Sequence, residues 1–116
     1  MNPAAVLILD DDLGFCMWLG HLLSNKGIRA LPSCHSEEAL HISSTADYRI
    51  ELVIVNPDVE GCHEVLEENP NAKVMAIGEA GELKVDGTLQ RPGGRSLLPP
   101  ERYFEAIRKV LASAIT

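Results

Sequence analysis

Four places in this 116-residue chain put polar residues or a glycine directly after a predicted strand, where they could take part in chemistry. Three successive aspartates, Asp10–Asp12, follow the first apolar run, at 6–9. Asn56 and Gly78 each follow a later apolar run, and Arg91 follows the weaker strand signal at 88–90. Successive carboxylates on one loop repel each other, which favours a bound cation or a nearby basic residue. These residue types therefore indicate a pocket that holds a cation or an ion pair.

The aspartates also have a simpler interpretation, as a solvated acidic turn in which Asp12 caps a helix. Their position after a buried strand favours the pocket, because functional groups of doubly wound sheets gather beyond the carboxyl ends of the strands. Arg91, followed by Pro92, ends another such strand and supplies a cation for the same edge.

Composition excludes several classes of function. Ten Lys and Arg residues against 17 Asp and Glu give a net charge of −7, which repels phosphate backbones and anionic lipid. No apolar stretch is long enough for a signal peptide or a membrane span. Three cysteines without a C-x-x-C pair are typical of free thiols in a reducing compartment. We expect a cytoplasmic protein that binds neither nucleic acid nor membrane.

Apolar runs alternate with segments of helical periodicity, which is the signature of βαβ units around a parallel sheet. The runs predict strands, and the periodic segments predict helices, the second strand ending at Pro32. The predicted strands are 6–9, 28–31, 52–55, 74–77 and 88–90, and the predicted helices are 13–26, one from Ser36, 61–69 and one from Pro99.

One connection is too short for the pattern. Only the nine residues Glu79–Gly87 separate Gly78 from Thr88, whereas a helical crossover needs about 10–12 residues. The helix between the fourth and fifth strands is therefore expected to be shortened or absent. Its loss should uncover one face of these strands, to be covered by Gly93–Pro99, with Leu97 and Leu98 as the lid, or by a second chain.

Five segments resemble, in order, the landmarks of response-regulator receivers of two-component systems, and the match runs from about residue 5 to residue 114. They are Val6–Asp12, Ser36–Leu40, Glu51–Asn56, Asn71–Gly78 and Asp86–Pro92. The resemblance implies one receiver-like domain over residues 1–116. It also implies a three-layer, flavodoxin-like α/β fold with a five-stranded parallel sheet in the order 2-1-3-4-5.

In that family an acidic pair and an aspartate after the third strand hold Mg²⁺, and that aspartate accepts a phosphoryl group. A Thr or Ser after the fourth strand and a Lys after the fifth contact the phosphoryl group. By position, Asp10 and Asp11 match the acidic pair, and Asn56 stands at the acceptor. Gly78 stands where the hydroxyl belongs, and Arg91 replaces the Lys.

These departures predict a degenerate phosphorylation pocket and no enzymatic activity. A neutral amide cannot attack a phosphoryl donor as a carboxylate does, and Asn56 removes one anionic ligand from the metal. We expect weak or no Mg²⁺ binding at Asp10 and Asp11, and no other cofactor. Arg91 is expected to pair with Asp10 or Asp11.

The resemblance implies a signalling module that docks to a partner, either a histidine kinase or output protein or a second copy of itself. The alternative is a working receiver that phosphorylates itself with Mg²⁺ on a non-standard acceptor such as Asp58. A nucleotide sensor is disfavoured because the chain has no phosphate-binding glycine loop. For Met17 and Trp18 a core role is favoured over a binding hot spot, with one of the two at the surface. The four histidines are expected at the surface or at its boundary, without a metal site.

Overall fold

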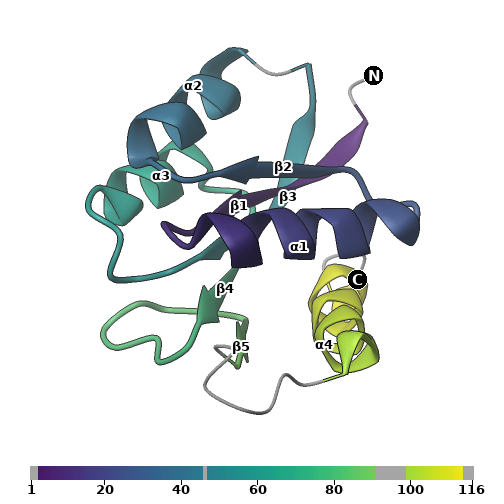
Figure 1. Ribbon diagram of the computed structural model, residues 1–116. Coiled ribbons are helices and arrows are strands. Elements are labelled where there is room, and N and C mark those ends of the chain that lie inside the picture. Colours follow the sequence, from purple (N-terminus) through teal and green to yellow (C-terminus); the bar gives the residue numbers. More distant parts are fainter. Residues whose placement is uncertain (1–2, 46, 91–98, 114–116) are drawn as a thin grey trace.

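The computed structural model describes residues 3–45, 47–90 and 99–113 of the chain. Five parallel strands form one sheet in the order β2-β1-β3-β4-β5, and helices cover both of its faces (Figure 1). The predicted three-layer fold and strand order are confirmed. The elements are β1 (Ala4–Leu9), α1 (Leu13–Asn25), β2 (Ala30–Ser33), α2 (Ser36–Thr45), β3 (Arg49–Val55), α3 (Cys62–Glu68), β4 (Lys73–Ile77), β5 (Gly87–Leu89) and α4 (Pro100–Ser113).

The two sheet faces form separate apolar cores because neighbouring residues of a strand point to opposite sides. On β1, Val6 and Ile8 pack with α1 and α4, whereas Leu7 and Leu9 pack with α2 and α3. All four side chains are at most 1% exposed. Continuous apolar runs such as 6–9 are therefore required here, since both faces of the central strands are buried.

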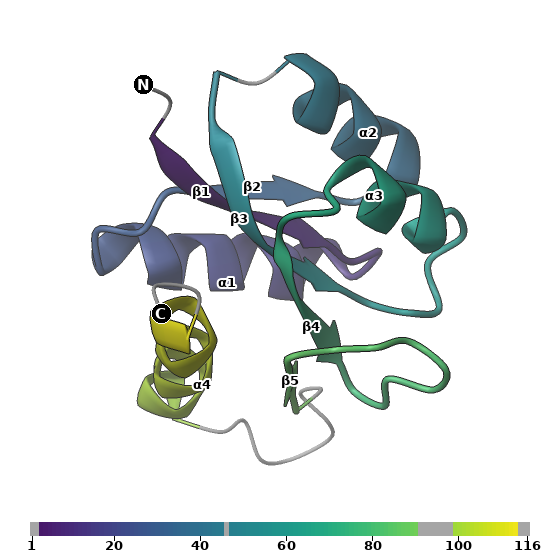
Figure 2. The same ribbon diagram turned by 180° about the vertical axis from the view of Figure 1, so that it is seen from behind.

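No helix lies between β4 and β5, as the short connection predicted, and α4 is the helix that follows β5 in the described residues. Figure 2 shows residues 78–86 as an open loop beside these strands. The predicted cover of this face by Gly93–Pro99 or by a second chain stays a prediction, and the described residues show only part of the face. Ala76 is fully buried, Leu83 from the loop packs against the core beneath α2 and α3, and the exposed position of β5 is the polar Thr88. Leu97 and Leu98 lie outside the described residues.

The second strand differs from its prediction. β2 begins at Ala30 rather than Ile28 and runs through Pro32, which pairs with Ile8 of β1. The hydrogen bonds from Val6 N to Arg29 O and from Asp10 N to Ser33 O show which residues of β2 face β1. By alternation, the nitrogen of Pro32 faces away from the sheet, and proline is tolerated there because β2 is an edge strand.

Met17 and Trp18 are both exposed, whereas a core role with at most one of them at the surface was predicted. Met17 is 52% exposed and Trp18 is 36% exposed. The Trp18 ring lies against the outer side of the core, with its centroid 6.0 Å from Phe15 and 5.3 Å from Tyr103. The aromatic neighbours therefore hold one side of the indole while the other side stays in solvent.

Candidate phosphoryl pocket and its amide lock

The carboxyl ends of β1 and β3 bring the predicted site residues together. Asp10 follows β1 and Asn56 follows β3, and the two strands are neighbours in the sheet. The backbone N–H of Asn56 donates to Leu9 O at 2.9 Å, which continues the strand pairing into the site. Asp10 is fully buried and Asn56 is only 3% exposed, so both polar side chains need partners within the protein.

The side chain of Asn56 links the two acidic positions. Its Nδ2 donates to Asp10 Oδ1 at 3.0 Å and, over a longer 3.5 Å, to Asp11 Oδ1. Its Oδ1 accepts from the backbone N–H of Asp58 at 2.9 Å. This last bond fixes the amide orientation, because a flipped side chain would set its oxygen against two carboxylates. We call this arrangement of Asp10, Asp11 and Asn56 the amide lock.

Asp12 does not belong to the lock. Its Oδ1 accepts from the backbone N–H of Phe15 at 3.1 Å, so the side chain caps the first turn of α1. Its own N–H donates to Asp10 Oδ1 at 3.3 Å. The acidic run is therefore divided: two aspartates face the amide, and the third begins the helix.

The amide lock fits Mg²⁺ poorly. A cation between Asp10 and Asp11 would need lone pairs directed at it, whereas Asn56 directs two N–H groups toward the same oxygens. Within residues 3–45, 47–90 and 99–113, no three Asp, Glu, His or Cys side chains converge as a metal group. The amide hydrogens of Asn56 thus provide the two carboxylates with part of the positive potential that a metal ion would provide.

Gly78 lies at the end of β4 with φ of +82°, in the left-handed region that side chains disfavour. Its N–H donates to Leu89 O at 2.8 Å, so the backbone there closes the pairing with β5. The position offers no hydroxyl to a ligand. Arg91, the predicted partner of Asp10 or Asp11, lies outside the described residues.

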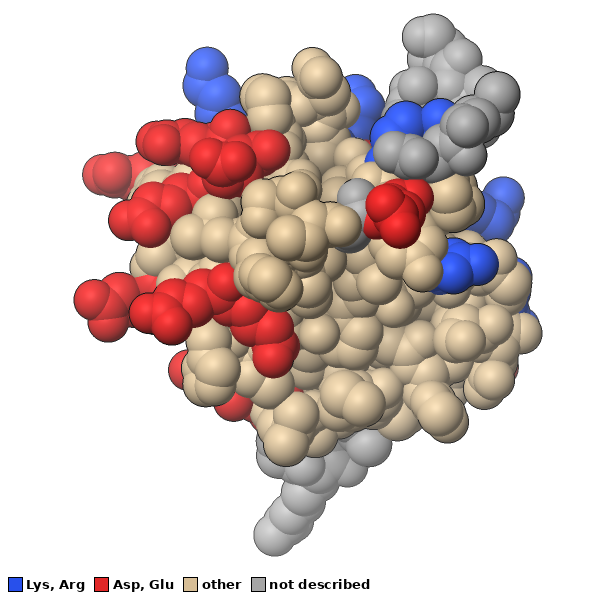
Figure 3. Space-filling model, turned by 90° about the horizontal axis from the view of Figure 1, so that it is seen from above, with Lys and Arg blue, Asp and Glu red and all other residues tan. Residues whose placement is uncertain are grey.

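An acidic groove opens beside the lock, between the first turns of α2 and α3. It encloses ≈ 810 Å³, and its acidic lining comprises Asp11, Glu37, Asp58, Glu60 and Glu64. Figure 3 shows the carboxylates gathered on one side of the molecule and the Lys and Arg side chains mostly on the other. The exposed Asp58 therefore shares its surroundings with other acids, which disfavours the approach of a further anion.

Two thiols flank the pocket, and both are held in the protonated form. Cys16 is fully buried, its Sγ lies 3.5 Å from Ser33 O, and burial raises its pKa to about 11. Burial and the nearby Glu38, Asp10 and Asp11 carboxylates raise the pKa of Cys34. Neither cysteine has the lowered pKa that a reactive thiol requires.

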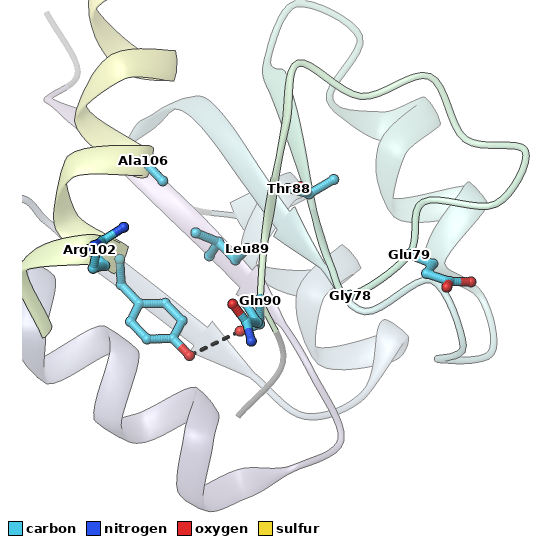
Figure 4. A pocket seen from close by; sticks show the side chains of 8 residues that line it. Gly78, Glu79, Thr88, Leu89, Gln90, Arg102 and Ala106 are labelled. Atoms are coloured by element: carbon cyan, nitrogen blue, oxygen red, sulfur yellow. Dashed lines mark hydrogen bonds between the residues drawn. The ribbon is translucent and has the colours of Figure 1, made fainter. Parts of the chain in front are cut away.

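A second cavity, of ≈ 470 Å³, lies between the end of β5 and α4. Figure 4 shows Gly78, Gln90 and Arg102 around it, and Tyr103 of α4 also lines it. The Tyr103 hydroxyl donates to Gln90 O at 3.0 Å and so ties α4 to the end of β5. Sequence reasoning did not single out this contact.

The chain resembles known proteins in structure but not detectably in sequence. No protein-family model matches the chain, and no curated protein matches it. Solved structures do match. A receiver domain protein of Methanospirillum hungatei gives a TM-score of 0.75 at 18% identity, covering 99% of this chain and 98% of that one. The chain has the receiver fold.

Other receivers agree over the same length. A two-component response regulator of Clostridium difficile gives a TM-score of 0.74 at 18% identity, covering 99% of this chain and 100% of that one. A chemotaxis response regulator of Vibrio cholerae gives 0.73 at 16%, covering 95% and 99%. No helix in the described part of this receiver fold is long and apolar enough to cross a membrane.

Proposed function

We propose that this chain is a pseudo-receiver, a signalling module that acts through protein–protein contacts without aspartyl phosphorylation. The observation that supports the proposal is the amide lock. Where the resemblance places the acceptor aspartate, Asn56 donates hydrogen bonds to the two carboxylates that would hold the metal. The pocket is filled by a contact within the protein rather than prepared for a cation.

The chemistry of phosphoryl acceptance supports the same conclusion. An acyl phosphate forms when an anionic carboxylate oxygen attacks phosphorus, and the Asn56 amide is neutral with a delocalised nitrogen lone pair. Its oxygen is already bonded to the Asp58 N–H. Gly78 brings no hydroxyl to a phosphoryl group, and the left-handed backbone there disfavours any residue that would. Two separate requirements for phosphorylation are therefore unmet.

The lock also connects the ends of two neighbouring strands. Here the Asn56–Asp10 bond is buried and joins the loops after β1 and β3 in the resting chain. We infer that the module presents one surface to its partner at all times, and that a signalling protein, a histidine kinase or an output protein, recognises it.

Mass spectrometry of the intact protein tests the proposal. The chain is incubated with acetyl phosphate and Mg²⁺, and its mass is compared with that of an untreated sample. No phosphoryl adduct is expected on the wild type. An established receiver treated in parallel shows that the donor is active. A stoichiometric gain of one phosphoryl group that maps to Asp10, Asp11 or Asp58 would overturn the proposal and establish the non-standard acceptor instead.

A further inference from the structure

Asn56 differs by one hydrolysis from the residue expected of a receiver. Loss of its side-chain nitrogen as ammonia, with water supplying the oxygen, converts the amide into the carboxylate of aspartate. That change replaces the donor of the amide lock by an anionic acceptor and brings a nucleophilic oxygen to the position of the phosphoryl acceptor. The character of the pocket therefore lasts only as long as this amide does.

Asparagine ordinarily deamidates through a ring that it forms with the next residue. The backbone nitrogen of that residue loses its hydrogen and attacks Cγ, and the side-chain nitrogen leaves as ammonia. Water then opens the cyclic imide at either carbonyl carbon, which yields aspartate or isoaspartate. The reaction needs an N–H on the following residue, and Asn56 is followed by Pro57, which has none. Covalent structure alone therefore closes this route at Asn56.

The fold hinders the slower route, direct attack of water on Cγ. Asn56 is only 3% exposed, its Nδ2 donates to Asp10 Oδ1, and its Oδ1 accepts from the Asp58 N–H. Its backbone oxygen accepts from the Val59 N–H at 3.0 Å, which closes the turn over the side chain's own residue. Water must displace these contacts before it reaches the amide carbon. Burial, however, protects Asn56 only while the chain is folded.

We propose that Pro57 makes the amide lock chemically permanent, because it protects Asn56 from conversion to aspartate in the states of the chain that burial does not cover. Those states are the chain before it folds and the chain after transient opening. Asn25 and Asn71, by contrast, precede residues that carry an N–H. The inference rests on the proposed function for the meaning of position 56, and it adds how the resting state of the pocket is preserved.

Pro57 also has a structural role, which an experiment must separate from the chemical one. It occupies the second position of the turn from Asn56 to Val59, a position that suits the fixed φ of proline. Substitution of Pro57 therefore changes the stability of the fold as well as the chemistry of Asn56. In denaturant the fold contributes nothing, so only the presence or absence of the N–H at position 57 differs between the two chains.

Ageing of the chain in guanidinium chloride at mildly alkaline pH tests the chemical role. Cleavage after Glu51 and Glu60 releases a peptide in which Asn56 is the only asparagine, and its mass shows whether OH has replaced NH₂. In the wild type, Asn56 should convert more than about tenfold more slowly than Asn71, because only direct hydrolysis, with its higher barrier, remains. Pro57→Ala should bring the rate at Asn56 to within about threefold of the rate at Asn71.

Pro70→Ala is the matched control, because Asn69 also precedes a proline. In denaturant this variant should open Asn69 to conversion and leave Asn56 as slow as in the wild type. Ageing of Pro57→Ala without denaturant measures the part played by burial. Conversion at Asn56 should then be more than about tenfold slower than in the unfolded variant, since it requires an opening of the fold.

Three results would overturn the proposal. The first is conversion of Asn56 in the unfolded wild type at the rate of Asn71. The second is an unfolded Pro57→Ala chain whose Asn56 stays as slow as in the wild type. The third is an equal rate at Asn56 in folded and unfolded Pro57→Ala. None of these measurements involves a phosphoryl donor, so failure here is distinct from failure of the proposed function.

Discussion

Replacing Asn56 by aspartate is the most informative perturbation of the amide lock. The side chain keeps its size and can still accept from the Asp58 N–H, but the group that faces Asp10 changes from a donor to an anionic acceptor. If the amide is what holds the two carboxylates together, Asn56→Asp must destabilise the fold even though it restores the residue expected of a receiver.

The geometry gives the size of the effect. The introduced oxygen would lie about 3.0 Å from Asp10 Oδ1, the present distance of Nδ2. At an effective dielectric constant of about 20, two unit charges at that separation repel by about 5.5 kcal/mol. Protonating a carboxyl with an ordinary pKa of about 3.9 costs about 4 kcal/mol at pH 7. The folded variant can either keep both carboxylates ionised or protonate one of them, and it takes the course of lower free energy. Protonation is the cheaper, so the expected loss of stability at pH 7 is about 4 kcal/mol.

The sign of the pH dependence follows. The repulsion raises the pKa of the introduced carboxyl in the folded state, so the variant loses stability as the pH rises through the ordinary aspartate range. Near pH 4 the loss should fall to about 1 kcal/mol, the value of a hydrogen bond. Mg²⁺ should restore stability at pH 7, because a divalent cation between three carboxylates replaces the amide hydrogens.

Urea denaturation at pH 4 and pH 7, with EDTA or with Mg²⁺, measures these changes. Asn69→Asp is the control, because the Asn69 amide donates to Ser43 Oγ and Val65 O and meets no carboxylate in those bonds. That variant should show a smaller loss without response to Mg²⁺. The electrostatic reasoning fails if Asn56→Asp unfolds at the wild-type urea concentration at pH 7, or if Mg²⁺ stabilises variant and wild type equally.

Three further predictions concern single positions. Asp12→Ala should lower the free energy of unfolding by about 1 kcal/mol in urea titrations, since it removes the cap of α1. Gly78→Ala should cost about 1–2 kcal/mol by the same measurement, because φ is +82° there. Burial raises the pKa of Cys16 from 9.0 to about 11, so its protonated thiol contributes stability that is complete below pH 9 and is lost as the pH approaches 11. The wild type should therefore lose more stability than Cys16→Ala between those pH values, and parallel pH profiles would contradict the buried thiol.

The sheet could be predicted from the sequence because its strands are buried on both faces. An uninterrupted apolar run such as 52–55 indicates a central strand of a parallel sheet. The strand order follows from the receiver resemblance. The ends of β2 were misplaced because proline normally stops a strand, and only the position of β2 at the edge of the sheet makes Pro32 acceptable. Trp18 was misplaced because helical spacing cannot tell a residue in the core from one at its rim.

For the site, the sequence could predict which side chains lie close together but not how the Asn56 amide is oriented. Asp10 and Asn56 follow neighbouring strands, so their meeting at one edge was foreseeable. The orientation of the amide depends on a turn bond from the Asp58 N–H, which no spacing rule contains. The different roles of the aspartates could not be predicted either: Asp12 caps a helix, as the simpler interpretation states, whereas Asp10 and Asp11 accept hydrogen bonds from the Asn56 amide.

Pro32 has a consequence for behaviour at high concentration. An open sheet exposes unpaired N–H and C=O groups along its outer strands, which can template strand addition and lead to aggregates. On β2 the residue at the middle of the outward side has no N–H to donate, and its ring packs against α1, where an added Cβ on Gly20 would lie 3.3 Å away. Pro32 therefore disfavours addition of a strand from a neighbouring molecule at this edge, which lowers the tendency of a concentrated sample to aggregate there.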